Sequence, residues 1–392
     1  MIYKNFKDYK LSNLGFGSMR LPMDGIKIDE KKSDEIIDTA INCGINYFDT
    51  AYVYLNQQAE SYLGKVLNKY QRDKWALATK FPGHTVRKSF NPEEIFEEQI
   101  KNCNVEYFDF YLLHNVYEKS YNVYTDEQWK IIDYLVKQKE LGRIKHLGFS
   151  THGLVPFMEK FLNEFGDIME FCQIQLNYLD WTLQNAKAKV QLLKERNIPI
   201  WVMEPLRGGK LVNLPEKALN EMKKVQPNWT GVEWGYRFLQ SLDVDMILTG
   251  FGTVEQVKEN VAYFEEKKDF GSKELTVALK VADKLKNEIP CTKCGYCKPG
   301  CPKGLDIPLL INQWNDMRFN PTYTVSMFMD SIPPEKQPSA CIKCGKCKNI
   351  CPQFIDIPSE LSAFAEKQAS IPSWADVCKE REKNSIKIKQ NN

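Results

Sequence analysis

Short apolar runs along the first two thirds of the chain alternate with longer segments in which apolar residues recur every three or four positions. The short runs are typical of buried strands, and the longer segments are typical of helices that bury one face. The predicted strands are 13–19, 46–51, 75–81, 108–114, 144–150, 172–176, 200–204 and 246–250. The predicted helices include 33–43, 92–103, 126–141, 185–196 and 254–264, with Ser33 and Asp126 as N-caps and Gly44 and Gly142 as helix stops.

Strands that alternate with helices in this way indicate a (β/α)8 TIM barrel, which we place at residues 1–285. An open, doubly wound sheet is the alternative. That fold usually carries G-x-G-x-x-G after its first strand, whereas Gly15-Phe16-Gly17 lacks the third glycine and a following helix. A charged stretch at 265–273 and a helix at 274–287 complete this part of the chain.

Two cysteine runs follow the barrel, each with the spacing C-x2-C-x2-C-x3-C-P. This spacing holds [4Fe–4S] clusters, and the cysteine before the proline usually ligates the other cluster of the pair. We therefore assign Cys291, Cys294, Cys297 and Cys351 to one cluster, and Cys341, Cys344, Cys347 and Cys301 to the other. Zinc and disulfides are the alternatives, but a third cysteine at the same spacing and a Cys-Pro step do not fit paired zinc ligands.

The flanks of the two cysteine runs also repeat each other. Asp306-Ile307-Pro308 matches Asp356-Ile357-Pro358, and an Asp-x-Pro step fits a helix start. A helix at 307–318 makes the predicted ferredoxin-like domain, residues 286–372, mainly helical. We expect the polar tail at 373–392 to be a solvated helix that frays.

Composition narrows the possible partners and the cellular location of the protein. A formal net charge of +2 over 392 residues gives no electrostatic basis for a nucleic-acid partner. The first ten residues lack the apolar core of a signal peptide, and no run approaches the ~20 apolar residues of a membrane span. We therefore expect a cytoplasmic protein without a membrane partner, and, because such clusters are oxygen-labile, an anaerobic host. The cysteines outside the motifs, Cys43, Cys103, Cys172 and Cys378, are expected in the core.

Four polar residues follow three consecutive predicted strands at their carboxyl ends, where barrels of this kind place their active sites. They are Asp49, Tyr54, Lys80 and His114. The runs Asp49-Thr50-Ala51-x-x-Tyr54, Ala78-Thr79-Lys80 and Tyr111-Leu112-Leu113-His114 resemble, in this order, the aldo-keto reductase family, and the resemblance covers about residues 10–265. It implies interconversion of a small-molecule carbonyl and an alcohol, in a branch of the family with appended ferredoxin modules.

The proposed chemistry of the four residues is coherent, although each alone could be a structural polar group. A phenol is a poor acid near neutrality, and a nearby ammonium lowers its pKa. We expect Lys80 to act in this way on Tyr54, the proton donor or acceptor, with Asp49 holding Lys80 and His114 orienting the carbonyl. His84 follows the third strand and could line the pocket, whereas His146 and His152 are expected to be incidental.

The resemblance also implies a nicotinamide site at the later strand ends. Its expected contacts are Ser150, Gln173, Met203, Arg207, Gly250, Thr253, Gln256 and Asn260. Met203 stands where many relatives have a stacking aromatic, and Gln256 where an arginine for the 2′-phosphate is expected, so NAD(H) is expected to bind at least as well as NADP(H). Arg207-Gly208-Gly209-Lys210 is a candidate phosphate cradle.

A mismatch in the number of electrons transferred by the two predicted kinds of cofactor keeps two other functions open. A nicotinamide transfers two electrons as hydride, whereas a [4Fe–4S] cluster transfers one, and a flavin can connect the two. FMN in the barrel could pass electrons between an organic substrate and an external ferredoxin or flavodoxin. A non-catalytic redox sensor is the second alternative, which the intact set of four residues disfavours.

Overall fold

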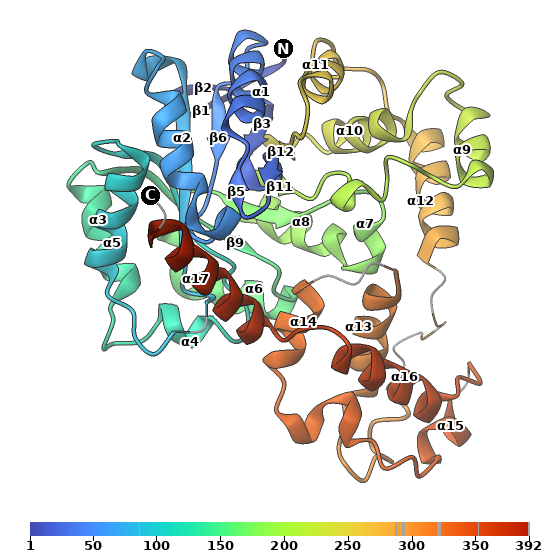
Figure 1. The fold of residues 1–392 in the computed structure, drawn as a ribbon. Coiled ribbons are helices and arrows are strands. Elements are labelled where there is room, and N and C mark those ends of the chain that lie inside the picture. The colour runs from blue at the N-terminus through green and yellow to red at the C-terminus, as the bar shows by residue number, and fades with distance from the viewer. Residues whose placement is uncertain are drawn as a thin grey trace.

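A closed barrel of parallel strands forms the larger part of the molecule (Figure 1). The structure is a computed structural model that describes residues 1–85, 87–286, 289, 291, 295–319, 323–351 and 353–390. The barrel strands are β3 (Leu14–Gly17), β6 (Tyr47–Asp49), β7 (Ala76–Phe81), β8 (Phe108–Leu113), β9 (Ile144–Thr151), β10 (Cys172–Gln175), β11 (Ile200–Met203) and β12 (Met246–Gly250). All eight predicted strands are confirmed, and β12 pairs with β3, which rules out an open sheet.

Helices cover the outside of the barrel. Those of the barrel part are α1 (Glu30–Asn42), α2 (Ala59–Leu67), α3 (Pro92–Cys103), α4 (Tyr121–Tyr124), α5 (Ile131–Glu140), α6 (Val155–Phe165), α7 (Asp180–Leu183), α8 (Ala186–Glu195), α9 (Glu216–Lys223), α10 (Gly231–Ser241), α11 (Val254–Ala262) and α12 (Ser272–Lys286). Gly44 and Gly142 follow α1 and α5 with φ of 88° and 75°, as predicted for helix stops. The predicted helix at 274–287 corresponds to α12, and Asn287 lies outside the described residues.

Both predicted N-caps are wrong. Asp29, not Ser33, caps α1, because its carboxylate accepts the Lys32 backbone N–H at 3.2 Å. Asp126 instead accepts from the Gln128 backbone N–H at 2.8 Å, which closes a turn before α5 begins at Ile131. A short polar side chain such as Asp or Ser can accept a backbone N–H in a turn as well as at the N-cap of a helix. The sequence alone therefore did not distinguish a turn from a helix start.

The amino end of the barrel is closed by a hairpin of β1 (Tyr3–Phe6) and β2 (Tyr9–Ser12). Phe6 reaches into the barrel and contacts Phe110 and Trp201, with ring centroids 5.6 and 5.1 Å apart. Trp201 is fully buried, and burying a large apolar side chain of this kind stabilises the fold by about 1.5–3 kcal/mol. This end is therefore a packed core, and the carboxyl ends of the strands are left for chemistry.

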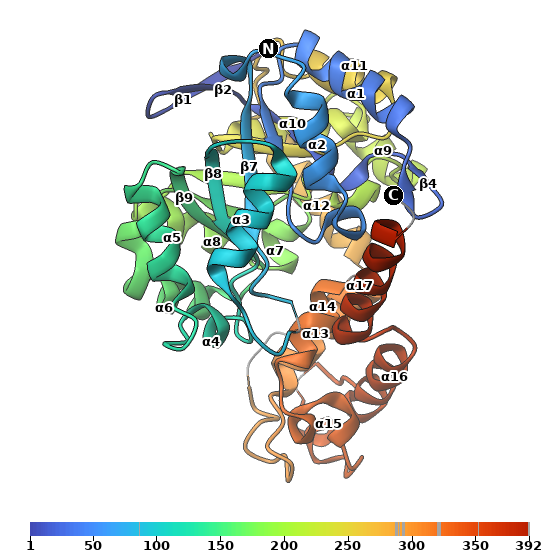
Figure 2. The same ribbon diagram turned by 60° about the vertical axis from the view of Figure 1, so that its left-hand side comes forward.

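The C-terminal domain is helical and internally repeated. Its helices are α13 (Ile307–Phe319), α14 (Tyr323–Asp330), α15 (Lys346–Ile350) and α16 (Ile357–Ala369). Trp314 of α13 and Phe364 of α16 stack with centroids 5.3 Å apart, and the ion pairs Lys298–Asp306 and Lys348–Asp356 are equivalent, each at 2.8 Å. The repeat that the flanking sequences predicted is thus confirmed. Figure 2 shows this domain and the β1–β2 hairpin on opposite sides of the barrel.

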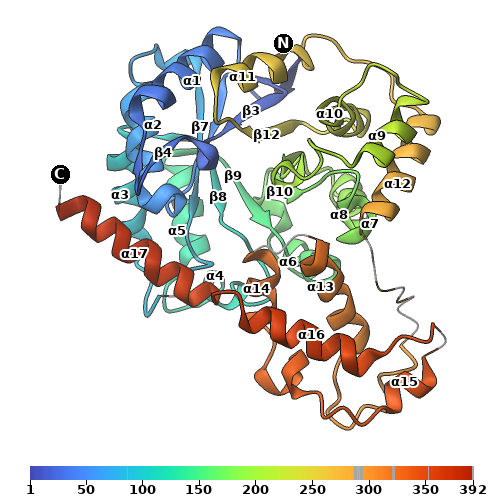
Figure 3. The ribbon, with the colours of Figure 1, turned by 45° about the vertical axis from the view of Figure 1, so that its right-hand side comes forward.

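The tail is a packed helix, not the solvated, fraying segment that its composition predicts. Helix α17 (Trp374–Gln390) lies against the barrel near α3 (Figures 1 and 3). Ser385 donates to the Gln57 side chain at 3.1 Å, and Lys389 pairs with Glu98 at 3.3 Å. Trp374 is only 5% exposed. The polar composition describes only the outer face of this helix.

The cysteines outside the two motifs differ in burial. Cys103 and Cys172 are buried in the barrel as predicted, whereas Cys43 and Cys378 are only partly buried. Among the helices that the structure describes, not one has the length and apolar character needed to span a membrane.

Candidate active site

A buried ion pair lies at the carboxyl ends of β6 and β7. Lys80 is fully buried, and its ammonium donates to Asp49 Oδ1 at 2.5 Å and to the Thr50 carbonyl at 2.7 Å. Burial alone would lower the pKa of Lys80, but Asp49 and Tyr54 outweigh burial, and the net shift is upward. Lys80 is therefore a charged ammonium held in one position at the floor of the barrel mouth.

Tyr54 and His114 lie beside this pair. Tyr54 begins the short helix η2 (Tyr54–Gln57) in the loop that follows β6, and the Lys80 ammonium is 5.0 Å from its ring centroid. The ring of His114, which follows β8, meets Tyr54 edge to face with centroids 5.7 Å apart. The fold thus brings the four predicted residues together, because consecutive strands of a parallel barrel end on the same side.

The pKa of Tyr54 moves opposite to the sequence-based expectation. Burial raises it, and the lowering by Lys80 compensates only in part. The expectation considered the cation and not the desolvation of the phenolate, which is the larger effect here. The Tyr54 phenol therefore keeps its proton at neutral pH. The Lys80 cation stabilises the phenolate once negative charge develops on the oxygen during proton transfer.

Three histidines gather near Tyr54 as neutral imidazoles. The rings of His84 and His114 have centroids 4.2 Å apart. Burial lowers the pKa of His84 to about 3 and that of His152 to about 4, and it holds the pKa of His114 well below its usual range. His84 therefore lies beside the four residues, as its place after β7 suggested. His146 bonds to Glu170 at 2.9 Å in the closed end of the barrel, away from this group.

The residues predicted to hold a nicotinamide follow the ends of β9 to β12. Ser150 and Gln173 are neighbours across β9 and β10, and the buried Gln173 Oε1 has no hydrogen-bond partner among the described residues, which fits a ligand amide. Ser150 Oγ accepts the Asn115 backbone N–H at 2.8 Å. Met203 ends β11 and is partly exposed, and Gly250 ends β12 and is exposed.

The start of α11 holds the other three predicted contacts. Thr253 caps the helix by accepting the Gln256 backbone N–H at 3.2 Å. Gln256 Oε1 accepts the Gly252 backbone N–H at 2.8 Å, so its side chain closes the loop. Asn260 accepts from the Tyr236 hydroxyl at 2.5 Å and is 8% exposed. These groups offer hydrogen bonds and no positive charge.

Arg207 does not stand where a phosphate ligand would be expected. It is 1% exposed, pairs with Asp180 at 3.1 Å and also pairs with Asp316 of α13. Asp316 in turn accepts from the Gln184 side chain at 2.8 Å. With its charge balanced by two buried carboxylates, Arg207 joins the barrel to the C-terminal domain. Lys210, three residues on, is exposed.

Sequence reasoning missed a cation at this edge of the mouth. Arg20 follows β3, is exposed, and packs so closely over Gly250 that a Cβ there would lie 2.5 Å from Arg20 Cγ. Arg20 also lies beside Gly208 and Glu204. Burial raises the pKa of the Glu204 carboxyl, and the charge of Arg20 opposes that rise. No local signal marks Arg20, because only closure of the barrel brings β3 next to β12.

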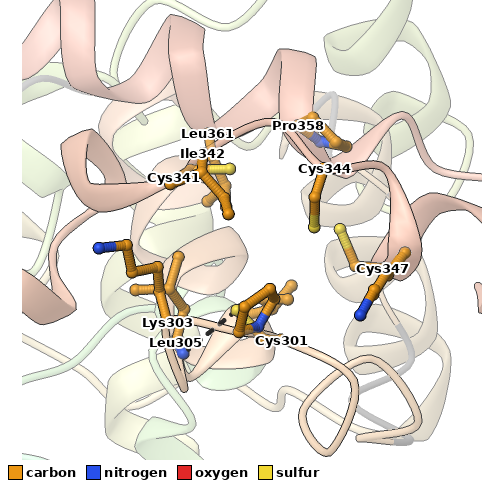
Figure 4. Close-up of a pocket in the computed structure, with 12 residues that line it drawn as sticks. Cys301, Lys303, Leu305, Cys341, Ile342, Cys344, Cys347, Pro358 and Leu361 are labelled. Atoms are coloured by element: carbon orange, nitrogen blue, oxygen red, sulfur yellow. Dashed lines mark hydrogen bonds between the residues drawn. The ribbon is translucent and has the colours of Figure 1, made fainter.

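The cysteines line two adjacent cavities in the C-terminal domain. Figure 4 shows the first cavity, in which the sulfur atoms of four cysteines face a common space, those of Cys301, Cys341, Cys344 and Cys347. Leu305 N–H donates to Cys301 Sγ at 3.5 Å. The second cavity is lined by Cys291, Cys297 and Cys351, with Cys294 outside the described residues. Clustered thiols in an apolar pocket fit an iron–sulfur cluster, and the grouping is the crossed one that the sequence predicted.

Comparisons with known proteins agree with both parts of the chain. Residues 13–275 match the profile of the aldo/keto reductase family, and residues 290–355 match that of a 4Fe-4S dicluster domain. "Probable aldo-keto reductase 1" of Glycine max is 29% identical over 212 residues, which span 51% of this chain and 58% of that protein. "L-galactose dehydrogenase" of Arabidopsis thaliana is 24% identical over 293 residues, 69% of this chain and 89% of that protein.

A solved structure matches in the same way. The holo form of an aldo-keto reductase from Bacillus halodurans superposes with a TM-score of 0.57 and 25% sequence identity, over 70% of this chain and 93% of that chain. The profile match covers most of the barrel part and includes Asp49, Tyr54, Lys80 and His114. This oxidoreductase therefore belongs to the aldo/keto reductase family and carries a C-terminal 4Fe-4S dicluster domain.

Proposed function

We propose that this chain interconverts a small carbonyl compound and the corresponding alcohol at the barrel mouth. The observation that carries the proposal is the buried Lys80–Asp49 pair beside Tyr54 and His114. A buried ammonium that is held next to a phenol has a chemical use in proton transfer, whereas a structural ion pair would need no such neighbour.

Each of the four residues has one role in this proposal. Tyr54 donates a proton to the carbonyl oxygen, and takes it back in the reverse direction. Lys80 stabilises the phenolate as it forms, and Asp49 keeps Lys80 charged and in place. His114, which is neutral, can donate a hydrogen bond to the carbonyl oxygen and so orient it toward Tyr54.

A nicotinamide nucleotide, when bound, supplies or accepts the hydride. We place it over the ends of β9 to β12, held by Ser150, Gln173, Met203, Gly250, Thr253, Gln256 and Asn260, with Arg20 as an additional cation. The groups around Gln256 carry no charge, and Arg20 acts on the Glu204 carboxyl, so neither offers a dedicated cation to a 2′-phosphate, which is unfavourable to bury without one. We expect NADH to bind at least as tightly as NADPH in a titration of the anaerobic protein.

In the C-terminal domain we assign two [4Fe–4S] clusters to the crossed cysteine sets, Cys291, Cys294, Cys297 and Cys351, and Cys341, Cys344, Cys347 and Cys301. Ile307 lines both cavities. Two clusters predict about eight iron and eight sulfide per chain. They would exchange single electrons with an external ferredoxin or flavodoxin.

The test of the proposed function uses anaerobically purified full-length protein. Tyr54→Phe is expected to lower carbonyl reduction by about 10²–10⁴-fold, the usual size of general acid catalysis, with nucleotide affinity nearly unchanged. Unchanged turnover in this variant on every carbonyl tested would remove Tyr54 from the mechanism. Tightly bound flavin, with no binding of either nicotinamide, would replace the proposal by an FMN enzyme that exchanges electrons through the clusters.

A further inference from the structure

Helix α17 runs along one edge of the barrel (Figures 1 and 3) and packs on η2, the short helix that begins with Tyr54. Its first residue, Trp374, donates from Nε1 to the His84 carbonyl at 3.2 Å. The indole stacks on the His84 ring with centroids 5.6 Å apart at 25°. Because His84 contacts His114, the C-terminal helix is in indirect contact with Tyr54 through two rings.

Arg381 lies two turns after Trp374 on the same helix face, since residues seven apart line one side of a helix. Its guanidinium carbon is 5.2 Å from the Trp374 ring centroid, and the side chain is partly buried. Among the described residues it has no carboxylate partner and no hydrogen bond. Its charge lowers the pKa of Tyr54, His84 and His114, so the guanidinium is close enough to act on all three.

The charges that face this space are mainly positive. Lys80 and Asp49 balance each other, and Glu98 is held by Lys389 and the Tyr52 hydroxyl. His84, His114 and His152 are neutral, whereas Arg87, which stacks on Tyr52 at 4.9 Å, adds a second guanidinium that acts on His84. Arg381 is only partly buried, but it has no carboxylate partner among the described residues and faces no excess of negative charge, so this space favours an anionic group.

The position of Arg381 separates it from the proposed cofactor site. Helix α17 packs on η2 and pairs with α3, which follow β6 and β7, whereas the proposed nicotinamide contacts follow β9 to β12. In the closed barrel β10 and β11 lie opposite β6 and β7, and β3 and β8 separate the two groups of strands. An anionic group that binds Arg381 would therefore lie on the substrate and not on the nucleotide.

We propose that Arg381 binds a carboxylate on the carbonyl substrate, so that this enzyme acts on oxo acids and the corresponding hydroxy acids. The inference rests on the proposed function and specifies its substrate class. A guanidinium presents paired N–H donors in a planar fork that matches a carboxylate, and stacking on Trp374 orients that fork. The carbonyl would then lie between Arg381 and the Tyr54–His114 pair.

The test compares the kcat/KM of each enzyme for an oxo acid and for its neutral ester. Succinic semialdehyde and pyruvate are the acids, and their methyl esters are the controls. Arg381→Gln should lower kcat/KM for the acids by about 10–100-fold, mainly through KM, because a charged hydrogen-bond pair is lost. It should change the esters by less than about threefold, and Arg381→Lys should restore part of the loss on the acids.

Two controls distinguish loss of a carboxylate contact from a general loss of activity. Lys383→Gln removes an exposed charge from the same helix and should leave both substrates unaffected. Ester turnover in Arg381→Gln reports a folded, competent site. Equal losses on acid and ester, or a wild-type preference for the esters, would overturn the role of Arg381 and leave the proposed carbonyl chemistry intact. Absence of turnover on every acid and ester in the wild type would instead count against the proposed function itself.

Discussion

Replacement of Lys80 by methionine isolates the contribution of the buried cation to proton transfer. The ammonium lies 5.0 Å from the Tyr54 ring centroid. At this separation two unit charges interact by about 3 kcal/mol with an effective dielectric constant of about 20. Because the phenol carries only part of a charge in the transition state, we expect a loss of about 10- to 100-fold in kcat, since each 1.36 kcal/mol is a factor of ten.

The pH dependence gives the same variant a second readout. In wild type, Lys80 opposes the rise that burial causes in the pKa of Tyr54. Lys80→Met removes that opposition and raises the pKa of Tyr54 further. Carbonyl reduction requires the protonated phenol, so its high-pH decline should move to higher pH in the variant. Because burial already raises the pKa of Tyr54 above its ordinary value of about 10, steady-state rates must extend from about pH 7 to beyond pH 11, with the nucleotide saturating, to measure both effects.

Two controls test whether the cation acts through Tyr54. Asp49→Asn combined with Lys80→Met removes both members of the ion pair and avoids leaving a buried carboxylate alone, which would be destabilising. It should be as slow as Lys80→Met. In a Tyr54→Phe background, Lys80→Met should lower kcat by less than about threefold, because the two residues act on one step. An equally large loss in both backgrounds would refute the reasoning.

The remaining predictions concern the clusters, the pH dependence of stability, and the domain contact. Cys351→Ser should disrupt the cluster built on the Cys291 run and spare the other; loss of only the other cluster, seen in iron content and spectra, would reverse the assignment. Burial raises the pKa of Glu60 from 4.5 to about 7. The native state therefore binds a proton more tightly than the unfolded chain, and the wild-type free energy of unfolding should fall between pH 4.5 and 7 by up to about 3 kcal/mol. Urea unfolding gives the free energy of unfolding of Glu60→Gln relative to that of wild type. This difference should rise in favour of the variant by that amount from pH 5 to pH 8, and a difference that does not vary with pH would contradict the prediction. Asp316→Ala should lower the free energy of unfolding by about 3 kcal/mol, because it removes one of the two carboxylates that pair with Arg207. Limited proteolysis between the domains should become faster in this variant. An unaltered rate would show that the Arg207–Asp316 pair does not hold the domains together.

Local patterns in the sequence determined the eight barrel strands and the grouping of the cysteines. A buried strand needs only a short apolar run, and a parallel barrel sends every strand end to one side, so Asp49, Lys80 and His114 were expected together. The crossed arrangement of Cys301 and Cys351 follows from ligand spacing within two short loops. These features depend on few residues that are close in sequence.

Only the tertiary structure decided what lies next to these elements. Closure of the barrel brings Arg20 over Gly250, and docking of the C-terminal domain pairs Arg207 with Asp316. The polar composition of α17 predicts solvent on all sides, yet Trp374 places the helix over His84. The pKa of Tyr54 depends on how much of the molecule buries it. Contacts between distant segments and desolvation are sums over the whole fold, and no local pattern in the chain records them.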